Sequence, residues 1–152
     1  SDLAVMAEAT KILEEFGIPH ELFLTSAHRT PERTSDFARH AEQRGVKIII
    51  AGAGAAAHLA GVLASQTQLP VIGVPIDATA LHGLDALLST VQMPGGIPVA
   101  TMAIGKAGAK NAALYAIRIL ALEDKKIRTK LSAYIKGMAL TVEKKQANIT
   151  AS

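Results

Sequence analysis

Residues 46–61 read VKIIIAGAGAAAHLAG, a nearly continuous apolar run that leads directly into a glycine-rich segment. Such a run is typical of a strand in a parallel sheet, because both of its faces are covered and neither alternates toward water. We therefore expect a strand over 46–51 and, after a loop, a short helix over 58–65. A buried strand that leads through a loop into a helix is the repeating unit of an α/β fold.

Similar elements flank this stretch on both sides. Upstream we expect a helix that Asp2 caps and Gly17 ends, and a second helix that begins at Thr30 and Pro31 and ends at Gly45. The other expected elements are strands over 21–25, 70–75 and 97–104 and helices over 81–91, 107–122 and 124–145.

Strands that alternate with helices predict an α/β fold with an open parallel sheet, in which ligands bind beyond the carboxyl ends of the strands. Four polar or glycine-rich segments are expected at these ends: 25–31, 52–61, 75–83 and 93–96. Their shared position predicts a ligand site more strongly than any one segment does.

The composition narrows the class of protein. A chain of 152 residues with 49% hydrophobic residues is suited to one packed domain. No apolar run reaches the roughly 18 residues needed to cross a bilayer, and no signal-peptide pattern is visible. The absence of cysteine fits a reducing compartment, so we expect a cytoplasmic protein with no membrane partner. A formal net charge of +3 and only 3% aromatic residues argue against nucleic-acid binding.

The segment TSAHRTP, residues 25–31, places a histidine beside an arginine after the expected strand over 21–25. His28 could act as a general acid or base, because imidazole binds and releases protons near neutral pH. Arg29 could bind a phosphate through its planar fork of donors. The alternative is a polar turn that happens to carry a basic pair, and the position at a strand's carboxyl end favours the ligand site.

The glycine-rich segment matches neither the dinucleotide fingerprint nor the Walker loop. Its small residues would let a ligand approach backbone N–H groups that suit an anion, although tight packing of strand on helix explains the composition equally well. His58 either caps the following helix or contacts a ligand, and Lys106 could meet an anion. Because the histidines lack ligand spacing and no acidic cluster accompanies them, we expect no metal.

Six segments, taken in order, resemble the PurE family of purine biosynthesis: SAHRTP at 26–31, IIAGAG at 49–54, AAHL at 56–59, PVIGVP at 70–75, QMPGGIPVATMAIGKAG at 92–108 and NAAL at 111–114. The AAHL segment is similar to class I, the mutases that rearrange N5-carboxyaminoimidazole ribonucleotide into 4-carboxy-5-aminoimidazole ribonucleotide. The class that carboxylates aminoimidazole ribonucleotide directly lacks this segment. The resemblance implies a flavodoxin-like three-layer αβα sandwich, no cofactor, and assembly as a homo-octamer.

The resemblance also implies a mechanism and a set of site residues. The carbamate of the substrate would lose carbon dioxide, which stays trapped while carbon 4 of the imidazole attacks it. His28 would carry the proton between carbon and nitrogen, and Arg29 would contact the ribose phosphate. The other implied substrate-binding residues are Ser1, Asp2, Ser26, Ala27, Gly52, Ala53, Gly54, His58 and Leu59.

The sequence departs from the family pattern in three places. The family has a strand and a Gly-Ser pair just before the position that matches Ser1, so we expect the native protein to have upstream residues that supply a central first strand, which is missing here. Ala55 stands where the family usually has glycine, and Ala60 where it usually has proline. If position 55 needs a positive φ, alanine would strain the loop by roughly 1 kcal/mol or more.

We expect a single PurE-like domain over 1–152, with a core over 1–122 and a C-terminal helix and tail over 123–152. This amphipathic helix has an apolar stripe that packs either on its own domain or against a neighbouring subunit: Ile127, Leu131, Tyr134, Ile135, Met138 and Val142. Two alternatives to the mutase stay open, namely a direct aminoimidazole ribonucleotide carboxylase and a non-catalytic ribonucleotide-binding paralogue.

Overall fold

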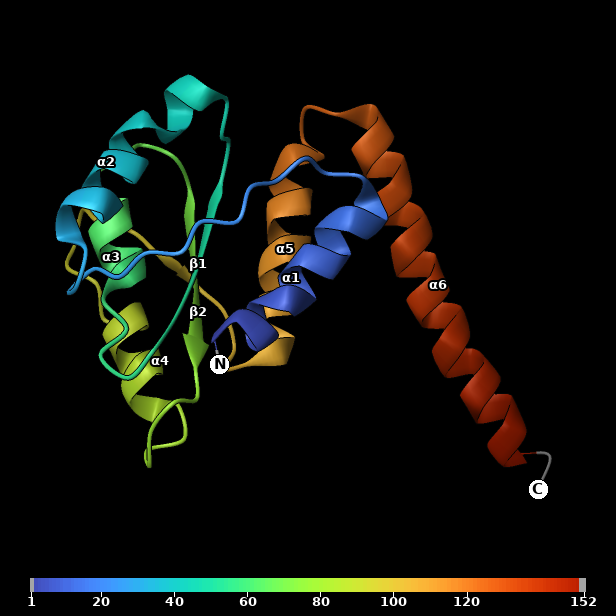
Figure 1. Ribbon diagram of the computed structural model, residues 1–152. Coiled ribbons are helices and arrows are strands. Elements are labelled where there is room, and N and C mark those ends of the chain that lie inside the picture. Colours follow the sequence, from blue (N-terminus) through green and yellow to red (C-terminus); the bar gives the residue numbers. More distant parts are fainter. Residues whose placement is uncertain (1, 151–152) are drawn as a thin grey trace. The chain divides into compact units, whose positions relative to one another are not determined.

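The computed structural model describes residues 2–150 (Figure 1). The chain forms two compact units, Ser1–Ala116 and Ile117–Ser152. The first unit contains the sheet. The boundary falls within α5 (Lys106–Leu120), and the second unit contains α6 (Lys125–Thr150). Within the described residues, no helix combines the length and the apolar character that a membrane span requires.

The first unit is built on a parallel sheet, which has three strands in the described part of the chain. The strands β1 (Ile49–Gly54), β2 (Val71–Ile76) and β3 (Ala100–Thr101) lie in that order across the sheet. β1 and β2 pair along their whole length, and every residue of β2 is buried. An apolar strand behaves this way when helices cover both of its faces, so the predicted α/β class is confirmed.

Helices cover this sheet on both faces, as Figure 1 shows. On one side lie α2 (Pro31–Ala41), α3 (Leu59–Ala64) and α4 (Leu84–Val91); on the other lie α1 (Asp2–Phe16) and the part of α5 that belongs to the first unit. The predicted three-layer αβα arrangement is confirmed, and α6 confirms the predicted C-terminal helix.

Two glycines in neighbouring strands allow the helices to approach the sheet closely. A Cβ atom at Gly52 would meet the Met6 side chain of α1, whereas one at Gly73 would meet Thr90 of α4 and Ala60 of α3. Their missing side chains are therefore part of the packing of opposite layers. Glycine content alone does not mark a ligand site in this fold.

We expect Gly73→Ala to lower the free energy of unfolding by about 1–3 kcal/mol, the usual cost of overpacking a filled core. The added methyl group would press on Thr90, on Val99 at 3.0 Å and on Ala60 at 3.3 Å, in the middle of the sheet. Urea denaturation measures the change. The matched control is Gly95→Ala, because a Cβ at Gly95 meets nothing within 4 Å; equal midpoints for the two variants would contradict the packing argument.

The ends of the first two helices follow the sequence signals, with one exception. α1 ends before Gly17 at φ 69°, and α2 continues as a 3-10 turn, Glu42–Arg44, that ends at Gly45 with φ 87°. Both glycines occupy the left-handed region that terminates helices. Thr30 precedes α2 as predicted, but its side chain does not cap the helix; its hydroxyl instead donates to the carbonyl of Ser26.

Three expectations about the strands need correction. The segment 21–25 forms no strand, because none of the described strands pairs with it and a strand requires such a ladder. β1 lies three residues later than predicted, and β3 is reduced to two residues of the predicted 97–104. The segment 93–96 follows α4 and precedes β3, so it does not lie at a carboxyl end.

The second unit contains α6, whose first turn is fixed by Asp124. One carboxylate oxygen of Asp124 accepts hydrogen bonds from the backbone N–H groups of Lys126, at 2.8 Å, and Ile127, at 3.1 Å. Leu131 of the expected apolar stripe is buried, whereas Met138 and Val142 are exposed. α6 extends beyond the predicted end at residue 145. Its C-terminal half contains exposed apolar side chains.

Candidate active site

The turn over 26–30 connects the segment after α1 to the start of α2 and contains His28. The backbone N–H of Thr30 donates to the carbonyl of Ser26 at 2.9 Å, which closes the turn. The Ser26 hydroxyl in addition accepts the backbone N–H of Arg29 at 3.2 Å. These hydrogen bonds close the turn, and its central residue, His28, is exposed at the surface.

His28 meets His58, which lies 30 residues further along the chain. Nε2 of His28 lies 2.9 Å from Nδ1 of His58, and the two rings stand nearly perpendicular, with 5.0 Å between their centroids. In this contact one ring nitrogen donates its hydrogen and the other accepts it, so the two imidazoles are joined by a hydrogen bond. Both imidazoles are exposed, which leaves the pair accessible to a ligand.

His58 reaches this position from the loop after β1. It occupies the residue just before α3, but its side chain does not cap the helix. The structure therefore rejects the helix-capping alternative and gives the ring a contact with the other candidate histidine. The glycine-rich segment and the TSAHRTP segment are distant in the sequence, and these two side chains bring them into contact.

The glycines of β1 have packing roles. Gly52 leaves room for Met6 of α1, and a Cβ at Gly54 would meet the side chain of Ala78 and, at 3.1 Å, the carbonyl oxygen of Ile76. Ala53 lies between them, and all three are half-buried. Tight packing, which the sequence analysis left open as the alternative to ligand binding, accounts for both glycines. Their strand leads into the loop that contains His58.

Ala55 has φ 54°. This is the positive φ at which an alanine at position 55 is expected to be strained. An L-residue other than glycine adopts this conformation at a cost of about 1–2 kcal/mol. The strained residue lies three positions before His58, inside the loop that brings this ring to His28. Strain in this loop is therefore stored beside the histidine pair.

We expect Ala55→Gly to raise the free energy of unfolding by about 1 kcal/mol, because relief of the left-handed strain outweighs the extra freedom of glycine in the unfolded chain. Chemical denaturation measures the change. Ala56→Gly is the matched control, since Ala56 is exposed and does not have a positive φ. If both variants are destabilised equally, the backbone at position 55 is not strained.

The other predicted site residues lie in the turn of His28, at the starts of three helices, or outside the described residues. Arg29 follows His28 in the turn and is exposed; Ala27 and Leu59 are half-buried. Asp2 is exposed in the first turn of α1, and Ser1 lies outside the described residues. Lys106 is exposed at the start of α5.

Sequence reasoning missed the threonines that hold the turn. Thr34 of α2 is fully buried, and its hydroxyl lies 2.8 Å from that of Thr25. The Thr25 hydroxyl also lies 3.0 Å from that of Thr30. The only available signal was the recurrence of threonine at 25, 30 and 34, of which the last two have helical spacing.

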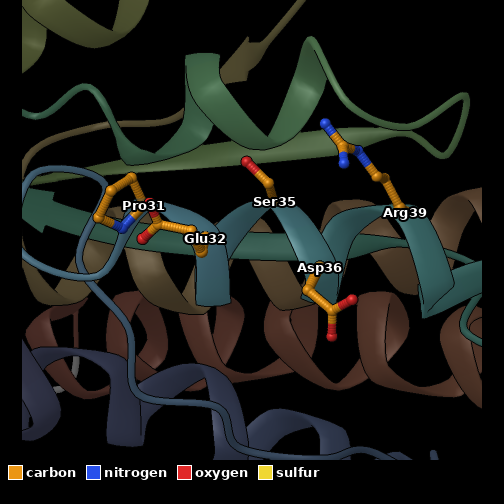
Figure 2. Close-up of a pocket in the computed structure, with 5 residues that line it drawn as sticks. All are labelled: Pro31, Glu32, Ser35, Asp36 and Arg39. Atoms are coloured by element: carbon orange, nitrogen blue, oxygen red, sulfur yellow. The ribbon is translucent and has the colours of Figure 1, made fainter.

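A separate hollow of about 420 Å³ lies along α2, with Pro31, Glu32, Ser35, Asp36 and Arg39 as its lining (Figure 2). These five side chains follow successive turns of one helix, and neither His28 nor His58 is among them. Arg39 donates to the side chain of Gln66 at 3.0 Å. Among the residues that the structure describes, no three metal-ligating side chains cluster, here or elsewhere.

A parallel sheet between two helical layers, with paired histidines in the loops before α2 and α3, defines an α/β ligand-binding or catalytic domain. The comparisons with known proteins specify the family. The sequence model of the family described as "AIR carboxylase" matches residues 1–141, and the chain belongs to this family, which confirms the resemblance to PurE.

Several relatives have the name N5-carboxyaminoimidazole ribonucleotide mutase, among them the following two. The protein from Pyrococcus horikoshii is 61% identical over 145 residues, which are 95% of this chain and 81% of the relative. The protein from Thermotoga maritima is 54% identical over 145 residues, with 95% and 84% covered. The crystal structure of Treponema denticola PurE has a TM-score of 0.87 at 28% identity, over 97% of this chain and 90% of that one.

Proposed function

We propose that this protein is an enzyme, the mutase that converts N5-carboxyaminoimidazole ribonucleotide into 4-carboxy-5-aminoimidazole ribonucleotide. The structural observation that supports it is the 2.9 Å contact between the rings of His28 and His58. An isomerisation that moves a carboxyl group needs a proton carrier, and imidazole both takes and gives protons near neutral pH. The names of the relatives supply the substrate, and the product is the one that the family resemblance implies.

The chemistry moves one carboxyl group and one proton. The bond between the exocyclic nitrogen and the carboxyl carbon breaks, which releases carbon dioxide. Carbon 4 of the imidazole then attacks that carbon dioxide and forms the new carbon–carbon bond. His28 gives a proton to the exocyclic nitrogen as its bond to the carboxyl carbon breaks, and it takes the proton that carbon 4 loses after the attack, so no net proton or oxidant is consumed.

His58 supports this role through its contact with His28. In a neutral pair one ring must donate to the other, so this hydrogen bond couples the tautomer of one imidazole to that of the other. His58 and Leu59 would also wall the base and carboxylate. Gly52, Ala53 and Gly54 would complete that wall, and Ser26 and Ala27 would line the turn of His28. Arg29 would contact the ribose phosphate, and Asp2 would contact the ribose, with Ser1 beside it.

The deciding experiment supplies each ribonucleotide with and without bicarbonate. We expect N5-carboxyaminoimidazole ribonucleotide to be converted without added bicarbonate, because its own carboxyl group is the source of the carbon dioxide. Activity on aminoimidazole ribonucleotide that requires bicarbonate, with no conversion of the carbamate, would instead support the direct carboxylase. Tight ribonucleotide binding without turnover in the intact protein would support the non-catalytic paralogue.

The proposal includes assembly as a homo-octamer in the cytoplasm, with one PurE-like domain per chain and residues 123–152 in contact with other subunits. Exposed apolar side chains support self-association: Leu84, Leu88 and Val91 of α4, and Ile135, Met138 and Val142 of α6. The absence of cysteine is consistent with a reducing compartment. Light scattering of the purified protein tests the assembly, since a mass of one or two chains would contradict it.

A further inference from the structure

We infer that Thr25 and Thr34 are positioning residues that hold the turn of His28 in its active geometry through a partly buried hydroxyl bridge. The inference rests on the proposed catalytic role of His28. It concerns two residues outside the SAHRTP segment, neither of which the sequence analysis or the proposed mechanism uses. Their hydroxyls join the segment before the turn to the helix after it.

The hydroxyl protons of the bridge can be assigned by counting donors. Thr34 gives its proton to the carbonyl of Thr30 at 3.0 Å, and Thr30 gives its proton to the carbonyl of Ser26 at 3.1 Å. Each hydroxyl has one proton, so with these two protons in place the proton of Thr25 serves its contacts with Thr34 at 2.8 Å and with Thr30 at 3.0 Å, one at a time. The hydroxyl of Thr34 then both donates and accepts, as a fully buried hydroxyl should.

The bridge encloses the residues that the proposed mechanism uses. Thr25 precedes the turn, Thr34 lies in the first turns of α2, and His28 and Arg29 lie between them. The Thr30 hydroxyl also accepts the backbone N–H of Ser26 at 3.0 Å, which ties the start of the turn to its end. Loss of the bridge would free the side of the turn that precedes His28.

No strand performs this task in the described structure. The segment 21–25 forms no ladder, so its backbone is not held by a sheet. Side chains attach the segment instead: Arg44 donates to Glu21 at 2.8 Å, and Phe23 stacks on Phe37 of α2 at 4.3 Å between ring centroids. The hydroxyl bridge is the next attachment along the chain, and it is the one adjacent to the turn itself.

Valine in place of Thr34 keeps the shape of the side chain and removes its hydrogen bonds. Burial of the apolar isostere is nearly neutral for stability when it leaves no buried group without a partner, and the partner hydroxyl of Thr25 still has Thr30 within 3.0 Å. Misplacement of a reacting group by about 1 Å costs up to a hundredfold in rate. We therefore expect the variant to lose rate while it retains its fold.

The experiment measures kcat and KM of the intact protein for Thr34→Val, Thr34→Ser and Thr25→Val, together with the imidazole NMR signals of His28. We expect Thr34→Val to lower kcat about tenfold, less than the cost of a 1 Å misplacement, with little change in KM or in the unfolding midpoint. Its His28 signals should shift, and Thr34→Ser should restore both kcat and the signals. The double variant Thr25→Val/Thr34→Val should be no slower than either single variant, because both remove one bridge.

Two results would overturn the inference. One is an unchanged kcat and unchanged His28 signals in Thr34→Val while His28→Asn is inactive. The other is a Thr34→Ser variant as slow as Thr34→Val, which would assign the effect to packing. If His28→Asn retains full turnover, the proposed catalytic role of His28 fails instead, and the His28 signals of the wild type, Thr34→Val and Thr34→Ser still decide whether the bridge positions the ring.

Discussion

Replacing His28 with asparagine is expected to lower kcat of the mutase reaction by about a hundredfold to ten-thousandfold, the usual contribution of a general acid–base group. Asparagine remains polar, but its amide cannot carry the proton from carbon 4 to the exocyclic nitrogen. The His28 ring is exposed and meets His58, so its removal leaves no buried group without a partner. Initial rates at saturating ribonucleotide measure the loss, and thermal unfolding verifies that the fold is retained.

The control for this variant is His40→Asn. His40 is also exposed, and its Nδ1 lies near the carbonyl of Asp36 in α2, away from the histidine pair. We expect this variant to retain full activity and a similar melting temperature. Full turnover in His28→Asn would contradict the proton-shuttle mechanism, since no other step of the proposal supplies a carrier for the proton.

The sequence predicts that a parallel sheet is present, but it does not predict where β1 begins and ends. The apolar run over 46–51 predicts a strand, yet β1 begins at Ile49 and continues through Gly54. Glycine and alanine have low strand propensity, so residues 52–54 look like a loop in the sequence. Their state is decided by β2, because Gly52, Ala53 and Gly54 lie opposite Val74, Pro75 and Ile76. A pairing between segments distant in sequence outweighs local preference.

The segment 21–25 shows the converse limit. Its apolar residues predict a strand, but the exposed side chains of Leu22 and Leu24 have no sheet to cover them in the described structure. Phe23 packs instead between two residues of α2, with Phe37 at 4.3 Å and the guanidinium of Arg33 at 4.7 Å from its ring centroid. Hydrophobic pattern identifies an extended segment, whereas the neighbour decides whether it becomes a strand.

The candidate site was predictable as a list of residues but not as a geometry. His28 and His58 are both identified by their positions after expected strands, yet nothing in a spacing of 30 residues indicates that two ring nitrogens approach to 2.9 Å. The roles of Gly52 and Gly54 also depend on residues far away in the sequence, Met6 and Ala78. These contacts follow from the three-layer packing and not from any motif.

Arg29 is expected to determine affinity for the ribose phosphate. Hydrogen bonds to charged groups contribute about 1.5–3 kcal/mol, so Arg29→Ala should raise KM for the ribonucleotide by roughly tenfold to a hundredfold or more. kcat should change less, because the phosphate is remote from the carbon that reacts. Arg29→Lys should recover only part of the affinity, since lysine keeps the charge but lacks the planar fork that binds two phosphate oxygens.

A substrate without its phosphate separates this role from a general effect on the site. If Arg29 binds the phosphate, the corresponding nucleoside should have the same low kcat/KM with the wild type and with Arg29→Ala. The nucleoside has no phosphate, so neither enzyme can make the contact. Arg39→Ala is the matched control: Arg39 is a second arginine near the turn, but it donates to Gln66 at 3.0 Å, and its loss should leave KM unchanged. An equal loss of kcat/KM with the ribonucleotide and the nucleoside would show that Arg29 shapes the turn of His28 rather than binding phosphate, because a phosphate contact can only affect the substrate that has a phosphate.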